Sequence, residues 1–255
     1  MEQNYRFTVQ ENQFTGECVP CTLEVFNQYV DSPDVEQKIS MRRAVEAAVK
    51  QSLPLSEYLS NPRFLYFCKK QTGSKFQQLT DSEKLLQWVG YQKMWLPCFI
   101  FAVREFGLVA KTDKEGNPVL DTAGNPVMYH RRTQPNIKEL SRLFMFDADH
   151  LAISPREVFE RTQVADFPWR VLLAHETSSG EGLRLVSEIR IELGNIADNQ
   201  ICLARELGLM GMKGTTGKAV LDDSCIDASR ISYCPRRKDI YYINEKELFN
   251  TNNNE

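Results

Sequence analysis

The spacing of apolar residues divides the chain into a helical first part and a mixed second part. Apolar residues recur at helical spacing from Val35 to Gln51, after a Ser-Pro start that favours a helix N-terminus. A short helix is expected over Leu55–Leu59, with a break at Asn61-Pro62. Thr80 opens a further helix. Residues 1–92 are therefore predicted to form a mostly helical N-terminal region, although the first thirty residues show a mixed pattern.

From residue 93 onwards, apolar runs of strand length alternate with helical patterns. A Ser-Pro-Arg-Glu sequence at 154–157 predicts a capping box and a helix, and Gly208 predicts a helix end. This alternation is typical of an α/β or α+β core, which we place over residues 93–250. The polar residues 251–255 are expected to form a disordered tail. The strands are predicted over 94–103, 142–150, 169–174 and 183–191, with a last strand pair at 231–233 and 240–243.

A short repeat interrupts the predicted sheet. Gly-Asn-Pro-Val occurs at 116–119 and again at 124–127. Proline cannot donate a hydrogen bond to a sheet ladder, so neither copy suits a central strand. The repeat predicts a hairpin or paired turns that protrude from the sheet, and the segment 127–132 is expected to return to it.

Composition excludes several classes of protein. The chain has 255 residues, of which 42% are hydrophobic and 25% charged, with a net charge of −3. These values are ordinary for a globular protein. No apolar run approaches the ~18–20 residues of a spanning helix, and the N-terminus lacks the pattern of a signal peptide. Membrane, secreted and fibrous classes are not expected, and the seven cysteines are consistent with a reducing, cytoplasmic location.

The first candidate for chemistry is a pair of acids at the end of an apolar strand. Asp147 and Asp149 are two residues apart, so a strand would place both side chains on one face, with Cα atoms ~6–7 Å apart. Two Mg²⁺ or Mn²⁺ ions ~3.5–4 Å apart would suit that spacing. Taken alone, the pattern is more typical of a strand end that meets solvent.

Two further motifs follow the acid pair. The segment 178–184 contains two serines, two glycines and an arginine, which favour phosphate binding as much as a plain hairpin turn. The segment 222–230 offers Asp222 as a further carboxylate and Arg230 as a further cation. Asp227 in that segment fits equally well as a turn residue that hydrogen-bonds its own backbone.

The order of the three motifs resembles the archaeo-eukaryotic primase, or primase-polymerase, superfamily. The motifs are Phe-Asp-Ala-Asp-His at 146–150, Ser-Gly-Glu-Gly-Leu-Arg at 179–184, and Asp222 followed eight residues later by Arg230. They are most similar to those in the primase-like N-terminal domain of virulence-protein-E-type proteins of bacterial mobile elements. The resemblance covers residues 95–244. It departs from the superfamily at Arg184, where most members have histidine.

The resemblance implies a primase-polymerase core with an RRM-like sheet and a metal-dependent nucleotidyltransferase activity. Mg²⁺ or Mn²⁺ would be the cofactor, and the partners would be a DNA template, nucleoside triphosphates and a helicase acting in trans. It implies catalytic and metal-binding roles for Asp147, Asp149 and Asp222. It implies nucleotide-binding roles for Ser179, Gly180, Gly182, Arg184 and Arg230.

Two other functions stay open at this point. Arg184 in place of histidine favours a non-catalytic nucleotide or nucleic-acid binder on the same fold, and an Asp-x-Asp pair also serves metal-dependent nucleases. Cys18 and Cys21 form a lone C-x-x-C without a second pair at zinc-finger spacing. The aromatic residues of the N-terminal helices are more typical of a core than of a stacking platform, although Lys69 and Lys70 lie beside them.

Overall fold

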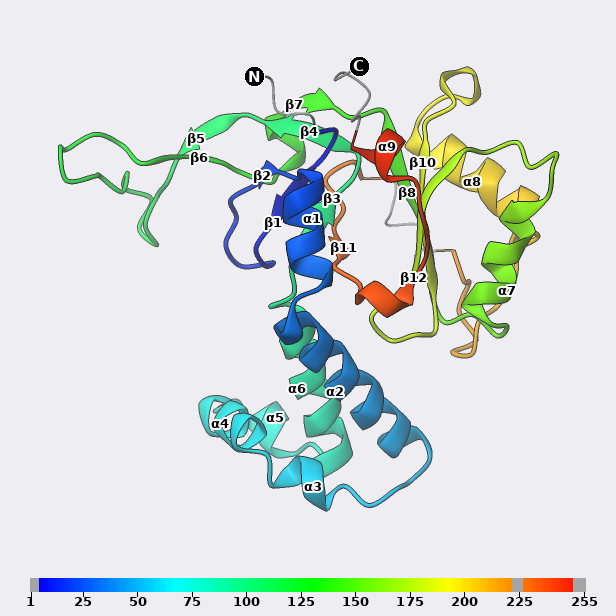
Figure 1. Cartoon of the computed structure of the whole chain (residues 1–255). Helices are drawn as coiled ribbons and strands as arrows, with labels where there is room; N and C mark the ends of the chain where they lie inside the picture. The colour runs from blue at the N-terminus through cyan, green and yellow to red at the C-terminus, as the bar shows by residue number, and fades with distance from the viewer. Residues whose placement is uncertain (1–4, 222–226, 250–255) are drawn as a thin grey trace.

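The computed structural model describes residues 5–221 and 227–249, so Asp222 and the tail 251–255 lie outside the described residues. Two four-stranded antiparallel sheets form the upper part of the molecule in Figure 1. The first has the strand order β11-β3-β1-β2 and the second β12-β9-β10-β8. Their strands are β1 (Thr8–Gln10), β2 (Val19–Pro20), β3 (Cys98–Ile100), β8 (Leu143–Ala148), β9 (Val171–Glu176), β10 (Leu183–Glu188), β11 (Ser232–Tyr233) and β12 (Ile240–Ile243). A mixed fold of helices and antiparallel strands, as the α/β or α+β prediction requires, is therefore confirmed.

Alternation along β8 explains why this strand is buried on both faces. Odd-numbered side chains such as Leu143 and Met145 belong to a core shared with β1, β3 and α1 (Leu23–Val30). Even-numbered side chains such as Phe144 and Phe146 belong to a second core, formed with α7 (Pro155–Glu160) and α8 (Ile196–Glu206). Because strand side chains alternate between faces, a continuous apolar run is what a strand between two cores needs.

The helices α2 to α6 form a separate lobe below the sheets (Figure 1). Its core contains Val45, Phe64, Phe67, Phe76, Leu85, Trp88 and Val89. The lobe is inserted between α1 and β3, and the strands and helix before it share the core of the strands after it. The domain boundary at residue 92 stays a prediction. The helices of the lobe are α2 (Pro33–Lys50), α3 (Ser56–Leu59), α4 (Pro62–Lys70), α5 (Ser74–Gln77) and α6 (Asp81–Lys93).

The repeated Gly-Asn-Pro-Val segments lie at the end of a long arm that protrudes from the sheets (Figure 1). The arm begins with β5 (Leu108–Ala110) and β6 (Met128–His130), which pair only with each other. In each copy an aspartate, Asp113 or Asp121, accepts hydrogen bonds from two backbone N–H groups of its own turn. The protruding hairpin is confirmed. The chain also returns beside the first sheet, as predicted for 127–132, since the backbone oxygen of His130 accepts from Cys18 N at 2.9 Å and Arg131 bridges to Glu17, just before β2.

One local prediction is confirmed and two are wrong. The predicted break at Asn61-Pro62 is present, since α3 ends at Leu59 and α4 begins at Pro62 with the Asn61 side chain as its cap. Ser154 precedes α7, but among the described residues its side chain makes no capping hydrogen bond, so the capping box is wrong. The strands at 231–233 and 240–243 do not pair with each other: β11 joins β3 and β12 joins β9.

Small elements complete the described chain. β4 (Val103–Phe106) pairs with β7 (Ile137–Leu140), and α9 (Glu245–Leu248) packs on β9. None of the helices in the described residues is both long enough and apolar enough to span a bilayer.

Candidate active site

The acid pair lies where the apolar core on one face of β8 ends. Asp147 follows Leu143 and Met145 on that face and is completely buried, and Asp149 is half-buried just beyond the strand. Burial and the neighbouring carboxylate of Asp147 both raise the pKa of Asp149. Two negative carboxylates close together in a poorly solvated place repel each other, and a nearby cation lowers this unfavourable energy.

Arg184 supplies one such cation. β10 pairs with β8 so that Arg184 lies directly opposite Asp147. The guanidinium Nη2 donates to Asp147 Oδ2 at 2.7 Å, and both side chains are almost completely buried. A buried ion pair is costly to break, because the remaining charge would stay in a poorly solvated place. The residue that departs from the superfamily pattern therefore holds the first acid of the pair.

A network of buried hydrogen bonds links Arg184 to the other sheet. Arg184 Nη1 donates to Ser232 Oγ on β11 at 3.2 Å, and Ser232 Oγ lies 3.4 Å from His175 Nε2 on β9. His175 Nδ1 lies 2.7 Å from the backbone oxygen of Glu176 and must donate to it, so Nε2 is the acceptor. Burial lowers the pKa of His175 to about 4 and keeps the ring neutral.

The glycine-rich segment forms the hairpin between β9 and β10. Gly180 has a φ of +79°, which favours glycine at the turn. Gly182 is required for a different reason. A Cβ on Gly182 would lie 2.6 Å from the backbone oxygen of Ala148 and 2.8 Å from Asp149 Oδ1. The second glycine of the motif thus allows the hairpin to pack directly against the acid pair.

Ser179 stabilises this hairpin from within. Its Oγ lies 3.0 Å from the hydroxyl of Thr177 and accepts from the backbone N–H of Glu181 at 3.4 Å. Segment 178–184 therefore forms the predicted hairpin turn, and this turn lies beside the two acids. Its phosphate-binding role stays a prediction. Sequence motifs that are up to 37 residues apart in the chain meet here through the β8–β10 pairing.

The helical lobe adds further cations around this site, and two arginines on α2 contact the hairpin. Arg42 on α2 donates to Ser178 Oγ at 2.6 Å. Arg43 donates to the backbone oxygen of Thr177 at 3.1 Å and forms ion pairs with Glu176 and Asp239. These contacts explain how the turn is held between the lobe and the sheet.

Lys93, the last residue of α6, is the third cation. Its ammonium lies 4.6 Å from the centre of the Tyr233 ring. Burial, Arg42 and Arg184 lower the pKa of Lys93 to about 8, while the two acids act in the opposite direction. Tyr233 is next to Ser232, which accepts from Arg184, so this lysine lies beside the same buried polar network.

The third motif is only partly described. Leu221 forms an isolated bridge with Ala148, between the two acids in sequence, and Asp149 N donates to the backbone oxygen of Val220 at 2.9 Å. Asp222, the expected third acid, lies outside the described residues. Asp227 accepts hydrogen bonds from the backbone N–H and hydroxyl of Ser229, as its turn-residue reading predicts.

Arg230, the last residue expected at the nucleotide site, is half-buried ahead of β11. It lines a small cavity with Phe101, Phe144 and Met145, beside the first half of β8. The structure thus packs Arg184 against Asp147 and Gly182 against Asp149, and places Arg230 beside the strand that carries the acids.

The donor atoms at the acid pair fit a divalent cation in type. Carboxylate oxygens are the ligands that Mg²⁺ and Mn²⁺ prefer, and Asp147 and Asp149 supply them from positions two residues apart. The described part of the chain contains no group of three acidic, histidine or cysteine side chains arranged for a metal. A metal site here would need a ligand beyond those two acids.

Sequence reasoning missed His175, Ser232, Lys93, Arg42 and Arg43. Nothing in their local sequence marks them, because each reaches the site through packing of distant elements. His150, which directly follows the acid pair, lies on the surface and contacts Glu181, with 3.4 Å between Nδ1 and Oε2.

The two cysteines of the C-x-x-C motif lie in different apolar cores. Cys18 packs with Ile100 and Val103, and Cys21 with Phe7 and Phe26. Burial raises the pKa of both thiols, that of Cys18 to about 12. Cys98 is also buried, and Cys202 is half-buried against the second core.

No family model matches the chain, and no curated protein matches it. Among solved structures, it is similar to the polymerase domain of Mycobacterium tuberculosis ligase D in complex with DNA, with 16% sequence identity and a TM-score of 0.28. The match covers 61% of this chain and 52% of that chain, so it spans about half of the known structure. This likeness is weak, and the case for a function depends on the geometry of the site.

Proposed function

We propose that the chain is a metal-dependent nucleotidyltransferase of the primase-polymerase type, acting on a DNA template with nucleoside triphosphates in a replication or mobile-element system. The observation that supports this proposal most is the close packing of Gly182 against Asp149. It joins a pair of acids to a glycine-bearing hairpin in the order that the superfamily motifs have. A helicase in trans would be the partner that opens the template.

Asp147, Asp149 and Asp222 would hold Mg²⁺ or Mn²⁺, since Asp222 directly follows the residue that bridges to Ala148. The metal would supply charge neutralisation at the α-phosphate and lower the pKa of the attacking hydroxyl. The other contributions to catalysis would come from side chains that position the acids and the nucleotide. Arg184 holds the carboxylate of Asp147 in place through its ion pair. Buried hydrogen bonds through Ser232 and His175 hold Arg184 in turn.

The triphosphate would lie against the hairpin, beside Ser179, Gly180 and Gly182. Arg184 would add positive charge from the strand below, and Arg230 from the neighbouring segment. Arg42 and Lys93 are further candidates for phosphate contacts, because both are cations at the hairpin side of the acid pair. Such preorganised cations stabilise the negative charge of a transferring phosphoryl group.

One observation favours the alternative of a non-catalytic binder. The Arg184 guanidinium already neutralises Asp147, so nucleotide could be bound at this site without a metal. The two functions differ in what they require. A nucleotidyltransferase needs a metal and the acids for extension, whereas a binder retains nucleotide in the presence of a chelator.

The test is primer extension on a single-stranded DNA template with a labelled primer, with dNTPs or NTPs supplied separately and Mg²⁺ or Mn²⁺ present. We expect extension that is lost in Asp147→Asn, Asp149→Asn and Asp222→Asn and kept in the control Glu192→Gln, which changes an exposed acid. Shortening of the primer would indicate a nuclease. Absence of extension, with nucleotide binding that persists in EDTA, would overturn the proposal in favour of the binder.

A further inference from the structure

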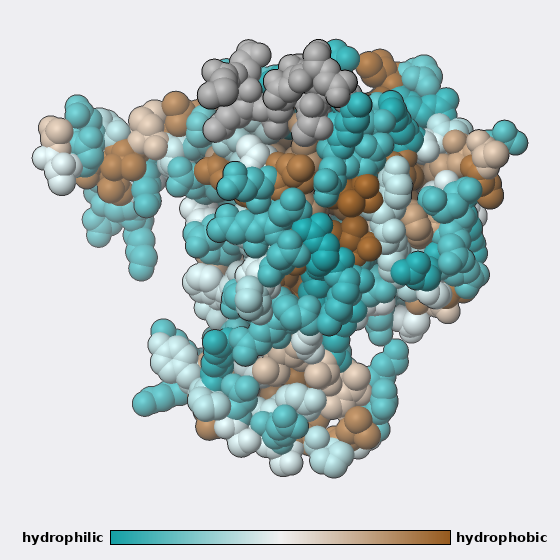
Figure 2. Space-filling view, viewed as in Figure 1, coloured by the Kyte–Doolittle hydropathy of each residue, from teal (hydrophilic) through white to brown (hydrophobic). Residues whose placement is uncertain are grey.

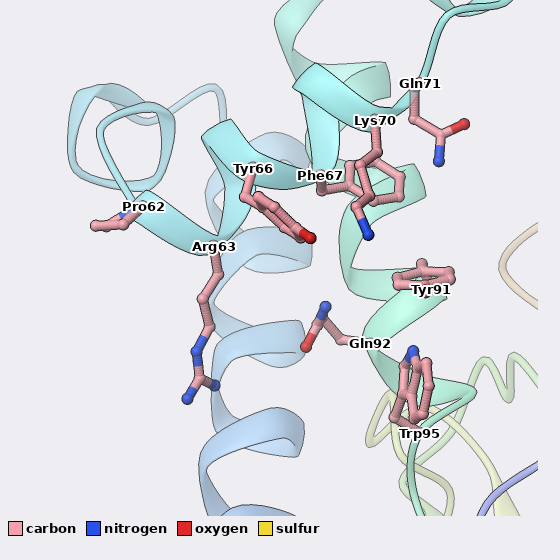
Figure 3. Close-up of a pocket in the computed structure, with 9 residues that line it drawn as sticks. All are labelled: Pro62, Arg63, Tyr66, Phe67, Lys70, Gln71, Tyr91, Gln92 and Trp95. Carbon is pink, nitrogen blue, oxygen red and sulfur yellow. The ribbon is translucent and has the colours of Figure 1, made fainter.

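A groove on the helical lobe exposes several aromatic rings to solvent. Its volume is about 530 Å³, and it lies between α4 and the end of α6 (Figure 3). Tyr66 on α4 is 59% exposed, and Trp95, just after α6, is 41% exposed. Tyr91 on α6 is also exposed and packs against Phe67 of α4, with ring centres 5.4 Å apart. Exposed aromatic rings grouped in one groove are a mark of a binding surface rather than of a core.

The two charged side chains that line this groove, Arg63 and Lys70, are both positive. Lys70 lies over the Tyr66 ring with its ammonium 4.7 Å from the ring centre, and Arg63 lies at the other side of Tyr66 (Figure 3). None of the nine lining residues in the described chain is acidic. The helix α4 itself carries Arg63, Lys69 and Lys70 and has no aspartate or glutamate. The groove therefore combines flat apolar faces with positive charge in a chain whose net charge is −3.

We propose that this groove binds a single-stranded nucleic acid, with its bases stacked on the rings of Tyr66, Tyr91 and Trp95. Lys70 and Arg63 contact the phosphates. Aromatic faces next to cations are how proteins hold unpaired bases with little sequence preference. A duplex does not fit this arrangement, since its bases already stack on one another.

The position of the groove suits a template path. The helix α6 carries Tyr91 in the groove and ends in Lys93, whose ammonium lies 4.6 Å from the centre of the Tyr233 ring. Tyr233 is next to Ser232, which accepts a hydrogen bond from Arg184, so one helix links the groove to the surroundings of the acid pair. The choice of a nucleic acid over an acidic peptide rests on this proximity and on the proposed function. The binding test below uses no metal and no triphosphate, so its outcome is independent of catalysis.

The experiment measures fluorescence anisotropy of a fluorescein-labelled dT20 oligonucleotide in EDTA. Tyr66→Ala and Trp95→Ala are each expected to weaken binding at least about fivefold, from the loss of one stacked base. The matched control is Leu65→Ala, which changes an exposed residue of the same helix that does not line the groove. Lys70→Ala should reduce the slope of log K against log salt by about 0.7.

The unmodified protein offers a second readout. Of the three tryptophans, Trp88 and Trp169 are only 1% and 5% exposed, so oligonucleotide stacking should quench Trp95 fluorescence selectively. The inference is overturned by unchanged binding in Tyr66→Ala and Trp95→Ala, by a duplex that binds as tightly as dT20, or by equal competition from polyglutamate. If dT20 binding depends on the groove but primer extension is absent, the groove assignment holds and only the proposed catalytic function fails.

Discussion

At the scale of single residues, the site is organised by a buried arginine rather than by its acids. Arg184 contacts Asp147 on the neighbouring strand and Ser232 on the other sheet, so one guanidinium links both sheets. A histidine at this position, as in the primase-polymerase motif that the sequence resembles, would have a shorter side chain with fewer donors. The arginine reaches both Asp147 and Ser232.

Removing this guanidinium should destabilise the fold. We expect Arg184→Ala to lower the free energy of unfolding by about 3–5 kcal/mol, because Asp147 would stay buried without its ion-pair partner. Urea denaturation measures the change. The control is Arg104→Ala, since Arg104 pairs with Glu139 on the surface and such pairs contribute about 1 kcal/mol or less. Equal effects of the two variants would contradict the buried ion pair.

The neutral state of His175 predicts a pH dependence of stability. The pKa of His175 is about 4 in the folded protein against 6.5 for an unperturbed histidine, so the unfolded chain binds the proton first. The stabilisation provided by neutral His175 is fully present above pH 6.5 and is lost as the pH falls toward 4. The free energy of unfolding should fall over this range by up to roughly 3 kcal/mol. We expect His175→Gln to have a flatter stability curve over this range than the unmodified protein. His150→Gln, at an exposed histidine, should leave the slope unchanged.

At the scale of elements, the hairpin after β9 is shaped by its contact with β8. Gly182 lies against the backbone oxygen of Ala148, and no side chain could be placed there without moving one strand. The close approach lets Leu183 pair with Ala148 and Arg184 pair with Asp147. The register of β10 on β8, and with it the Arg184–Asp147 ion pair, therefore depends on this glycine.

A methyl group at this position should separate the hairpin from the acid pair. We expect Gly182→Ala to abolish primer extension and to lower the free energy of unfolding by about 1–3 kcal/mol, the usual cost of overpacking. The matched control is Gly90→Ala on α6, where a Cβ has open space and alanine should stabilise the helix by up to about 1 kcal/mol. Extension assays and urea denaturation on both variants decide the matter, and normal extension by Gly182→Ala would be the contrary result.

The sequence predicts the elements that have a local signal and misses those that do not. The apolar run ending in Asp147 predicts β8 because a strand between two cores needs apolar residues on both faces. The pairing of β11 with β3 was missed, since two residues of strand carry no information about a partner more than 130 positions away. The break at Asn61-Pro62 is predicted because an Asn-Pro pair suits a turn and a helix cap equally well, and Asn61 caps α4 after that break.

At the scale of the whole molecule, the helical lobe and the sheets meet at the hairpin. Arg43 on α2 contacts the backbone oxygen of Thr177, the carboxylate of Glu176 and that of Asp239. A Cβ on Gly180 would lie 3.1 Å from the Arg43 guanidinium carbon, so the turn packs closely on this side chain. The acid pair and hairpin could be predicted from sequence because their motifs are contiguous. The contribution of the lobe could not, since it depends on how α2 docks.

Loss of Arg43 should therefore loosen the hairpin without disturbing the acid pair. We expect Arg43→Ala to speed hydrogen exchange at residues 177–182 and to raise the KM for nucleotide more than it lowers kcat, because the hairpin is where the triphosphate would lie. Exchange at the β8 amides that hydrogen-bond to β10 should stay slow, as β8 is buried along its whole length. The matched control is Lys50→Ala, which removes a more exposed contact from the lobe to Glu181 in the same hairpin and should change exchange little. If Arg43→Ala leaves exchange at the hairpin unchanged, the lobe does not hold the turn, and Arg42 and Lys93 would lose their structural basis as phosphate contacts.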